Sequence, residues 1–518
     1  MKGMSAPIEA RGSEGEPASI GDVESSRERR GCSPSEWPPP TSHARCDLAT
    51  EILLFFMMVF APWAFGTTED WSMNIMDAAG YGLGVLLLAK CLIRRRLGYR
   101  PPGWDFFDTG TPERARTTEL LMQGLAWLTV FLLLYTFISA ANARAAYDWE
   151  NEKFRYRDCI AWLPHSYDGP ATWRAFSNYL AWACFLWALR DWLWTLSESD
   201  RVAMEAETNS TRSRPFPFRL RRLLWVLSVN GAMLALEMLM QRIDGTVKLL
   251  WFRETLYNQD SGSQLGPFAY RANGAQYLNL IWPVTLGLWS TLERRAGRGR
   301  APSVHHVLLV CAALMIIVTF ISLSRGAVVV GAILLMASAL WLGLVRRWRI
   351  TPGVWGAWAL LGLALVSGLI LDWDSLAGRM KEFVPHFKGR DDVSVMARRM
   401  AEDFPVFGTG PETFQPVYLL YRISPEGYDP GQLHNDWLET RITFGWVGFG
   451  AILTALAIVL GKCFLPGGMR LRIDLVGTLW AAMAGCLLHA RWDLPFQVYA
   501  IVLTFLAYCG ILISTTRR

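Results

Sequence analysis

A histidine lies beside an amide and two carboxylates in one short stretch of the chain, as His434, Asn435, Asp436 and Glu439. Imidazole can accept a proton near neutral pH, and a neighbouring carboxylate can orient the ring and raise its basicity. We therefore predict that His434 is a general base and that Asp436 or Glu439 orients it. The same local sequence is also compatible with a histidine that only forms hydrogen bonds at a membrane interface.

The predicted helix around this histidine begins at Pro430, because the missing N–H of proline is not needed in the first turn of a helix. A spacing of i, i+4 and i+7 then predicts that His434, Leu438 and Arg441 share one helical face. An apolar run follows at 441–461. The histidine is thus expected at the mouth of a membrane helix.

Two arginines adjoin other apolar runs. Arg325 stands between two such runs with no room for a solvated loop, and Arg271 precedes the run that starts at Gly274. An arginine at the bilayer edge is costly unless it reaches the interface or binds an anion. Because guanidinium groups bind phosphate oxygens in bidentate fashion, two of them on one predicted face favour an anion site. Further polar residues that are candidates for supporting roles are Asn273, Asn435, Asp436, Arg390 and Arg398.

The composition is that of a polytopic membrane protein. Of the 518 residues, 52% are hydrophobic and only 19% are charged, whereas soluble domains carry nearer a quarter of charged residues. The formal net charge of +6 comes from arginines in short loops, so it reports membrane topology and not nucleic-acid binding.

The apolar residues fall into runs of about the length that crosses a bilayer. We predict an all-α membrane protein with about twelve transmembrane helices and a large outer loop between spans 9 and 10. The predicted spans are 48–66, 74–93, 120–141, 174–196, 222–240, 274–292, 305–323, 326–345, 353–371, 441–461, 473–489 and 493–514.

Arginine clusters alternate with loops that lack them, and positive clusters mark cytoplasmic loops. Both termini and all of these clusters are therefore predicted on the cytoplasmic side. The clusters are Arg94-Arg95-Arg96, Arg219-Arg221-Arg222, Arg294-Arg295-Arg298-Arg300, Arg346-Arg347-Arg349, Arg470-Arg472 and Arg517-Arg518.

The predicted domains are a disordered cytoplasmic tail, 1–46, and a membrane domain, 47–518, which includes a periplasmic loop, 372–440. The tail is rich in Gly, Ser, Pro and charge, and such a segment buries too little apolar surface to fold. A loop as long as 372–440 is usually functional. Within it, Asp391 is expected to cap a helix that runs from Asp392 to Asp403 and ends before Pro405.

Metal and nucleotide sites are not favoured by the sequence. Asp372 and Asp374 could hold a cation, but two acids at a helix end are more often a solvated boundary. The nine cysteines include no CxxC pair or zinc spacing. We predict no metal and no cofactor, and we interpret His489 and Asp493 as a structural polar pair at a tight membrane turn.

Several short motifs, in this order and with this topology, resemble the bacterial O-antigen ligase and O-antigen polymerase superfamily. The resemblance covers roughly residues 48 to 514. Its motifs are Gly266-Pro267-Phe268 through Arg271-x-Asn273, Ser324-Arg325-Gly326, Asp403-Phe404-Pro405-x-Phe407-Gly408-x-Gly410-Pro411-x-Thr413-Phe414, His434-Asn435-Asp436-x-Leu438, Phe444-Gly445-x-Val447-Gly448 and Leu488-His489-x-x-x-Asp493-x-Pro495-Phe496-Gln497. One departure is that many members read Asn-His soon after the first arginine, whereas this chain has Asn273-Gly274-Ala275-Gln276.

The resemblance implies a metal-independent glycosyltransferase of the bacterial inner membrane that acts in lipopolysaccharide or surface polysaccharide biosynthesis. Its donor would be a glycan on undecaprenyl pyrophosphate, and its acceptor a hydroxyl of a glycan, a lipid-A core or a protein. By this resemblance Arg271 and Arg325 would bind the pyrophosphate, and His434 would act as base toward the acceptor.

The sequence leaves three functions open. The first is an O-antigen ligase, and the second is a polymerase of O-antigen or exopolysaccharide or a protein O-oligosaccharyltransferase, which would share the site. The third is a flippase or other transporter of polyprenyl-linked glycans. A transporter should carry charged residues within its spans. Here the polar residues gather on one predicted face, which favours an enzyme.

Overall fold

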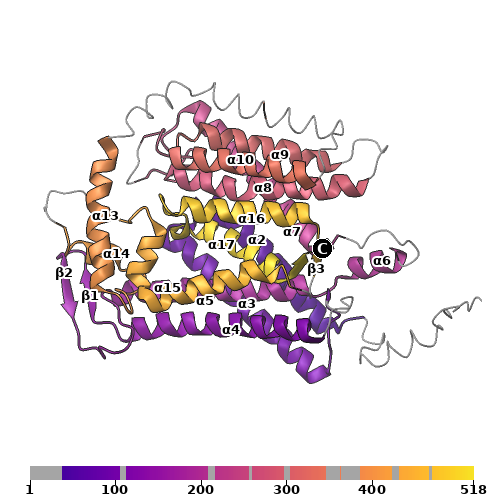
Figure 1. The fold of residues 1–518 in the computed structure, drawn as a ribbon, viewed down its shortest axis with the longest axis horizontal. Helices are drawn as coiled ribbons and strands as arrows, with labels where there is room; N and C mark the ends of the chain where they lie inside the picture. The colour runs from indigo at the N-terminus through magenta and orange to yellow at the C-terminus, as the bar shows by residue number, and fades with distance from the viewer. Residues whose placement is uncertain are drawn as a thin grey trace, which may run out of the picture.

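The computed structural model of the chain describes residues 38–104, 112–207, 216–255, 260–296, 304–345, 362, 385–422, 431–465 and 469–517. The long helices run side by side along one direction, except α13 (Pro385–Asp403), which stands across one end of the bundle (Figure 1). They are α2 (Thr41–Trp63), α3 (Asp70–Leu97), α4 (Pro112–Ala141), α5 (Gly169–Trp194), α7 (Phe218–Asp244), α8 (Arg271–Ala296), α9 (Val307–Ile321), α10 (Arg325–Val345), α13 (Pro385–Asp403), α15 (Asp436–Lys462), α16 (Ile473–His489) and α17 (Tyr499–Ile513). The shorter elements are η2 (Phe65–Thr67), β1 (Ala145–Asp148), β2 (Lys153–Tyr156), α6 (Glu198–Glu207), η4 (Val304–His306), α14 (Phe414–Tyr418), β3 (Met469–Leu471), η5 (Pro495–Gln497) and β4 (Thr515–Arg517).

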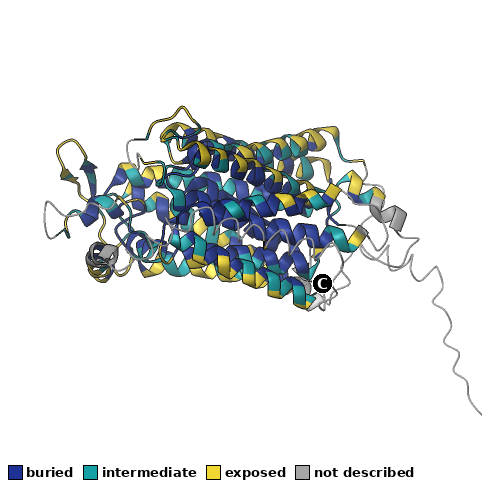
Figure 2. Ribbon diagram, turned by 90° about the horizontal axis from the view of Figure 1, so that it is seen from above, coloured by how far each residue is buried: buried dark blue, intermediate teal, exposed yellow. Residues whose placement is uncertain are grey.

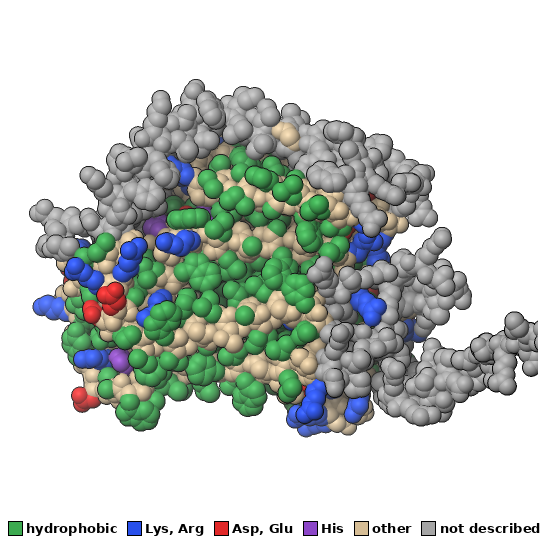
Figure 3. Space-filling view, viewed as in Figure 1, with side chains coloured by type: hydrophobic (Ala, Val, Ile, Leu, Met, Phe, Trp, Pro, Cys, Tyr) green, Lys and Arg blue, Asp and Glu red, His purple; other side chains and the backbone are tan. Residues whose placement is uncertain are grey.

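Seven helices among the described residues are long and apolar enough to cross a membrane. They are Thr41–Trp63, Asp70–Leu97, Arg116–Ala141, Phe218–Asp244, Val304–Ile321, Arg325–Val345 and Asp436–Lys462, and the apolar helices α16 and α17 are shorter. On the face seen in Figure 3, hydrophobic side chains cover the middle of the bundle, and charged side chains gather toward its two ends. A mostly helical protein with several candidate membrane spans is thus confirmed.

Every predicted span except 353–371 coincides with an observed helix, and all of 353–371 but residue 362 lies outside the described residues. The predicted number of twelve spans and the membrane side of each loop stay predictions. The helices α5 and α8 coincide with predicted spans but are not among the seven apolar ones.

The helix α8 forms the centre of the core. Its residues 272–290 are all buried, which is expected of a helix surrounded by other helices. The large side chains Tyr277 and Trp282 are fully buried in it, and Asn279 donates a hydrogen bond of 2.9 Å to the carbonyl oxygen of Ala327 at the start of α10. Figure 2 shows the same continuous buried interior along the middle of the bundle.

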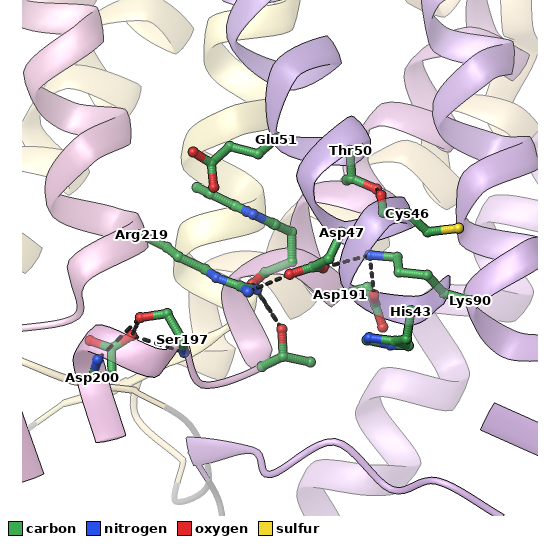
Figure 4. A network of polar contacts seen from close by, with 12 residues as sticks. His43, Cys46, Asp47, Thr50, Glu51, Lys90, Asp191, Ser197, Asp200 and Arg219 are labelled. Carbon is green, nitrogen blue, oxygen red and sulfur yellow. Dashed lines mark hydrogen bonds and ion pairs between the residues drawn. The ribbon is translucent and has the colours of Figure 1, made fainter. Parts of the chain in front are cut away.

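A network of ion pairs joins α2, α3, α5 and α7 at one end of the bundle (Figure 4). The fully buried Lys90 ammonium lies 3.2 Å from the Asp47 carboxylate and 2.7 Å from that of Asp191. Arg219 pairs with Asp47, and Arg94 pairs with Asp191 at 2.6 Å. Because removal of one partner would leave a buried charge uncompensated, this network fixes how the four helices pack.

The described arginine clusters lie at this same end of the bundle, as their contacts show. Arg294 and Arg472 both approach Asp474, and the guanidinium of Arg295 lies 5.5 Å from the ring centroid of Phe216, two residues before α7. The strand β3 carries Arg470 and pairs in parallel with β4 at the C-terminus. The cluster at 346–349 lies outside the described residues.

The opposite end of the bundle carries a second, smaller core under α13, α14 and the β1–β2 hairpin (Figure 1). Its members are Tyr167, Val393, Met396, Ala397, Met400, Ala401, Phe414, Val417, Tyr418, Leu433 and Ile442. The sequence interpretation of α13 was wrong at its start, because the helix begins at Pro385 and Asp391 lies inside it, not at its cap. It ends at Asp403, before Pro405, as predicted.

A break in α15 anchors the long loop to the bundle. Gly445 has φ 60° and ψ −171°, and this break frees carbonyl groups of the preceding turn. The oxygens of Ile442 and Thr443 accept hydrogen bonds of 2.9 and 3.0 Å from the amides of Thr409 and Gly410. A side chain at Gly445 would meet the oxygen of Val406 at 2.2 Å, so this approach requires glycine. The break thereby fixes the N-terminal turns of α15 against the loop.

Candidate functional site

His434 is positioned by a turn and not by a helix. Its φ is +53°, and α15 begins only at Asp436. Asn435 is the N-cap, and its side chain accepts a hydrogen bond from the amide of Leu438 at 3.3 Å. The predicted helix from Pro430 through His434 is therefore wrong, because an asparagine cap starts the helix later than the proline pattern suggests.

The imidazole of His434 contacts Asp493, in the turn between α16 and η5. The distance from His434 Nδ1 to Asp493 Oδ1 is 3.2 Å, and the His434 side chain is 20% exposed. A carboxylate only accepts, so Nδ1 donates its proton to this contact and the lone pair of Nε2 takes no part in it. The ring of Tyr270 lies edge-on to the imidazole with centroids 5.7 Å apart. These contacts fix the tautomer and the plane of the ring.

Asp493 itself is held from several sides. The hydroxyl of Tyr270 donates to Oδ2 at 3.4 Å, the amide of Leu494 donates to Oδ1 at 3.1 Å, and His489 Nε2 lies 3.6 Å from Oδ2. Burial raises the pKa of this carboxyl, but the hydrogen bond from His434 and the charges of His489 and His434 lower it, and the net pKa lies below the ordinary value. The group is thus an ionised carboxylate across the physiological range.

The prediction that Asp436 or Glu439 orients the imidazole receives no support from the geometry. The buried Asp436 carboxylate accepts a hydrogen bond of 2.8 Å from the amide of Phe496. Glu439 accepts from the amide of Leu433 at 2.9 Å and from the Gln497 side chain at 3.1 Å. Both carboxylates lie in the first turn of α15 and bind groups of η5, and Glu439 also binds the amide of Leu433. They thereby tie the last hairpin to the loop.

The two predicted anion-binding arginines start helices that border this cluster. Arg271 is the first residue of α8, is half-buried, and donates from Nη1 to the carbonyl oxygen of Gly262 at 2.5 Å. Arg325 is the first residue of α10 and is also half-buried. It follows a tight turn in which Leu323 has φ +58°.

Neighbours of these arginines touch the histidine cluster directly. Tyr270, which precedes Arg271, contacts both His434 and Asp493. Gly326, which follows Arg325, lies so close to His489 that an added Cβ would be 2.8 Å from Nε2. The segments that carry Arg271 and His434 therefore meet at the Asp493 carboxylate, and the segment that carries Arg325 adjoins His489 beside it, although all three are separated along the chain.

The residues predicted to have supporting roles lie in different parts of the structure. Asn273 is buried in the first turn of α8 next to the site, and Gln276 in the next turn accepts a hydrogen bond of 2.8 Å from His489 Nδ1. Arg398 is exposed on α13. The side chain of Arg390 and the acidic pair Asp372 and Asp374 lie outside the described residues.

A groove opens beside the histidine between α13, α15 and the turn after α16. Its volume is about 320 Å³. Its walls are Ser394, Arg398, Asn435, Trp437, Leu438, Arg441, Phe449 and Arg491. Asn435 joins the groove to the histidine cluster, since it directly follows His434.

One group among the described residues could hold a metal ion, formed by Glu293, His305 and His306. His305 Nε2 lies 2.7 Å from a Glu293 carboxylate oxygen. This group is at the C-terminal end of α8, whereas Arg271 is at its N-terminal end. At about 1.5 Å per residue, the two ends of this helix are too distant for the group to take part in chemistry at His434.

Residues 310–453 match the family model described as O-antigen ligase. This part of the chain resembles an O-antigen ligase domain. The resemblance to the superfamily is thereby confirmed. The matched residues of the O-antigen ligase domain include Arg325 and His434, whereas Arg271 and Asp493 lie outside them. A comparison with curated proteins found no match.

The O-antigen ligase domain, together with the apolar helices, indicates a membrane enzyme of glycan transfer in polysaccharide biosynthesis. Sequence reasoning singled out His434, which lies among the matched residues, but missed the contacts of Asp493 and Tyr270 with its imidazole. The motif Leu488-His489-x-x-x-Asp493 carried a signal for Asp493, but its partner comes from another segment. Tyr270 lies within the motif that runs from Gly266 to Asn273, but nothing in that motif indicated its contact with His434.

Proposed function

We propose that this chain is an inner-membrane glycosyltransferase that moves a glycan from undecaprenyl pyrophosphate to an acceptor hydroxyl, in the manner of an O-antigen ligase. The observation that carries the proposal is the contact of His434 Nδ1 with Asp493 at 3.2 Å, within a cluster bordered by the segments of Arg271 and Arg325. A fixed base thus adjoins two candidate ligands for a diphosphate.

In this reaction the Nε2 atom of His434 takes the proton from the acceptor hydroxyl, and the oxygen attacks the anomeric carbon of the donor. The bond from that carbon to the diphosphate oxygen breaks, and undecaprenyl pyrophosphate leaves with the electron pair. A single displacement inverts the configuration at the anomeric carbon. General-base catalysis of this kind contributes typically 10²–10⁴-fold.

The guanidinium groups of Arg271 and Arg325 would stabilise the negative charge that grows on the diphosphate as the bond breaks. The diphosphate is already an activated leaving group, so the reaction needs no nucleotide on that side of the membrane. Asp493 acts through His434 as a positioning residue, because it holds the imidazole in the tautomer with a free Nε2 and stabilises the imidazolium that forms. The proposed site lies on the outer face of the inner membrane, with both termini in the cytoplasm.

The test is transfer in vitro with the purified full-length protein, a defined undecaprenyl-pyrophosphate glycan and a panel of acceptors. The panel holds a lipid-A core, a second copy of the lipid-linked glycan and an acceptor peptide. Product on the first supports a ligase, on the second a polymerase, and on the third a protein transferase. Translocation of the donor across vesicles without any transfer product would point to a transporter and contradict the proposal.

A further inference from the structure

The groove beside His434 is strongly basic. Three of its lining residues are arginines, Arg398, Arg441 and Arg491, and none of the described residues that line it is acidic. They come from α13, from α15 and from the turn after α16, so they converge from segments that are remote in sequence. Like charges that share one groove repel each other unless an anion binds between them.

The guanidinium groups in the groove are not neutralised by the described part of the chain. Neither Arg398 nor Arg491 forms an ion pair with any described acidic residue, and both are exposed. Arg441 donates from Nη2 to the carbonyl oxygen of Ala401 at 3.3 Å, but its buried Nη1 has no hydrogen-bond partner among the described residues. Polar groups that are buried in proteins are normally paired, so the Nη1 of Arg441 indicates a missing acceptor.

Arg441 is held rigidly for such an acceptor. Its guanidinium carbon lies 4.1 Å from the centroid of the Trp446 ring, a cation–π contact that fixes the plane of the fork. A guanidinium fork of fixed plane is suited to the oxygens of a phosphate or a carboxylate.

The groove also offers aromatic surface. The rings of Trp437 and Phe449 line it with centroids 6.4 Å apart, and the Trp437 indole is anchored by a hydrogen bond of 2.9 Å to the oxygen of Leu487. A flat apolar wall beside charged groups fits an amphipathic molecule that carries a sugar ring and an acidic group.

The location separates this groove from the proposed donor site. No residue of α8 or α10, which begin with Arg271 and Arg325, is part of its lining. Asn435 lines the groove and follows His434, so a molecule in the groove approaches the base from the side of α13 and α15. That is the approach which an acceptor requires.

We propose that the groove binds a phosphate or carboxylate group of the acceptor and so selects acidic acceptors. The hydroxyl of the bound acceptor is then delivered to His434. The identification of the bound molecule as an acceptor rests on the proposed transferase function. The binding of an acidic glycoside in the groove stands independently of it, and the experiment has an arm for each.

The binding arm uses the full-length protein in nanodiscs of phosphatidylcholine, with a fluorescent alkyl glucoside 6-phosphate and its unphosphorylated form as probes. Arg398→Gln and Arg491→Gln alter exposed side chains and should leave the fold intact, while Arg399→Gln is a matched control on the exposed surface of α13 outside the groove. We expect each groove variant to weaken binding of the phosphorylated probe about 10-fold or more, since charge-assisted hydrogen bonds are lost. Binding of the neutral probe should be the same in all variants, and the Arg399→Gln protein should bind the phosphorylated probe as the wild type does.

The transfer arm measures steady-state transfer to a phosphorylated acceptor and to its phosphatase-treated form. The groove variants should raise KM for the phosphorylated acceptor, and leave both KM for the donor and KM for the neutral acceptor unchanged. A rise in donor KM instead would place the donor diphosphate in the groove and overturn the assignment. Equal effects on both acceptors, or none, would also overturn it.

Two further outcomes separate the alternatives. If phosphatidylglycerol nanodiscs abolish binding of the phosphorylated probe, the groove binds phospholipid headgroups and the acceptor assignment is wrong. If arginine-dependent binding is observed but no acceptor yields product, the proposed transferase function fails while the anionic site stands.

Discussion

The contact between His434 and Asp493 makes the effect of Asp493→Asn calculable. The substitution keeps the size of the side chain but replaces the ionised acceptor of the 3.2 Å contact with a neutral one. Hydrogen bonds to charged groups contribute about 1.5–3 kcal/mol. Each 1.36 kcal/mol corresponds to tenfold in rate. If this stabilisation acts on the imidazolium that forms in the transition state, kcat should fall roughly 10- to 150-fold.

The assay is steady-state transfer by the purified variant, with donor and acceptor varied separately. Because Asp493 acts through His434 and not on the diphosphate, donor KM should stay near that of the wild type. His434→Ala should lower kcat by about two to four decades. The double variant Asp493→Asn with His434→Ala should be no slower than His434→Ala alone, because Asp493 has no imidazole left to position. Glu402→Gln, at an exposed carboxylate on α13, is the control and should be silent.

Two results would refute this reasoning. Asp493→Asn with full kcat would show that the carboxylate does not assist the base. A double variant whose loss equals the product of the single losses would show that Asp493 acts separately from His434.

The same substitution should also change how stability depends on pH. The pKa of Asp493 is lowered in the folded protein, chiefly by the hydrogen bond from His434 against the opposing effect of burial. Its stabilising contribution is therefore complete above the ordinary carboxyl pKa of 3.8 and is lost as the pH falls below that value. Wild type should melt above Asp493→Asn at pH 7, and the difference should shrink below about pH 4.

The remaining predictions concern the donor site, the break in α15 and the topology. Arg271→Lys and Arg325→Lys should each reduce transfer about tenfold or more with normal expression, because a point charge cannot replace a guanidinium fork; full activity of Arg325→Lys would exclude a bidentate contact there. Gly445→Ala should lower the melting temperature, by an amount that corresponds to at least about 1–3 kcal/mol, because φ is positive and the added carbon would meet Val406 O; an unchanged melting curve would contradict the role of the break. In intact cells, an impermeant thiol reagent should label a cysteine introduced at Ser394 and spare one introduced at Ser213, and the reverse pattern would place the site on the cytoplasmic side.

The sequence by itself determined which segments are helical and where polar residues interrupt them. Apolar runs of bilayer length predict helices locally, because within a membrane the backbone must satisfy its own hydrogen bonds. The helices α10 and α15 cover the predicted spans 326–345 and 441–461 for this reason. The short motifs, by their order and with the predicted topology, likewise indicated the family that the match at 310–453 supports.

Only the tertiary structure decided which carboxylate faces the imidazole. Asp436 and Glu439 are nearest to His434 in sequence, yet both bind groups of the last hairpin, and Asp493, 59 residues away, takes the contact. The reason is conformational: once Asn435 caps α15, the following carboxylates point away with the helix while His434 stays in the turn.

The basic groove has the same origin. In the sequence, Arg398 is only a candidate for a supporting role, Arg441 shares a predicted face with His434, and nothing indicates that these two arginines meet Arg491. Their convergence depends on the packing of α13 against α15 and on the turn after α16, which no local pattern encodes. Electrostatic interactions depend on distance in space, and that distance is decided by how the helices pack.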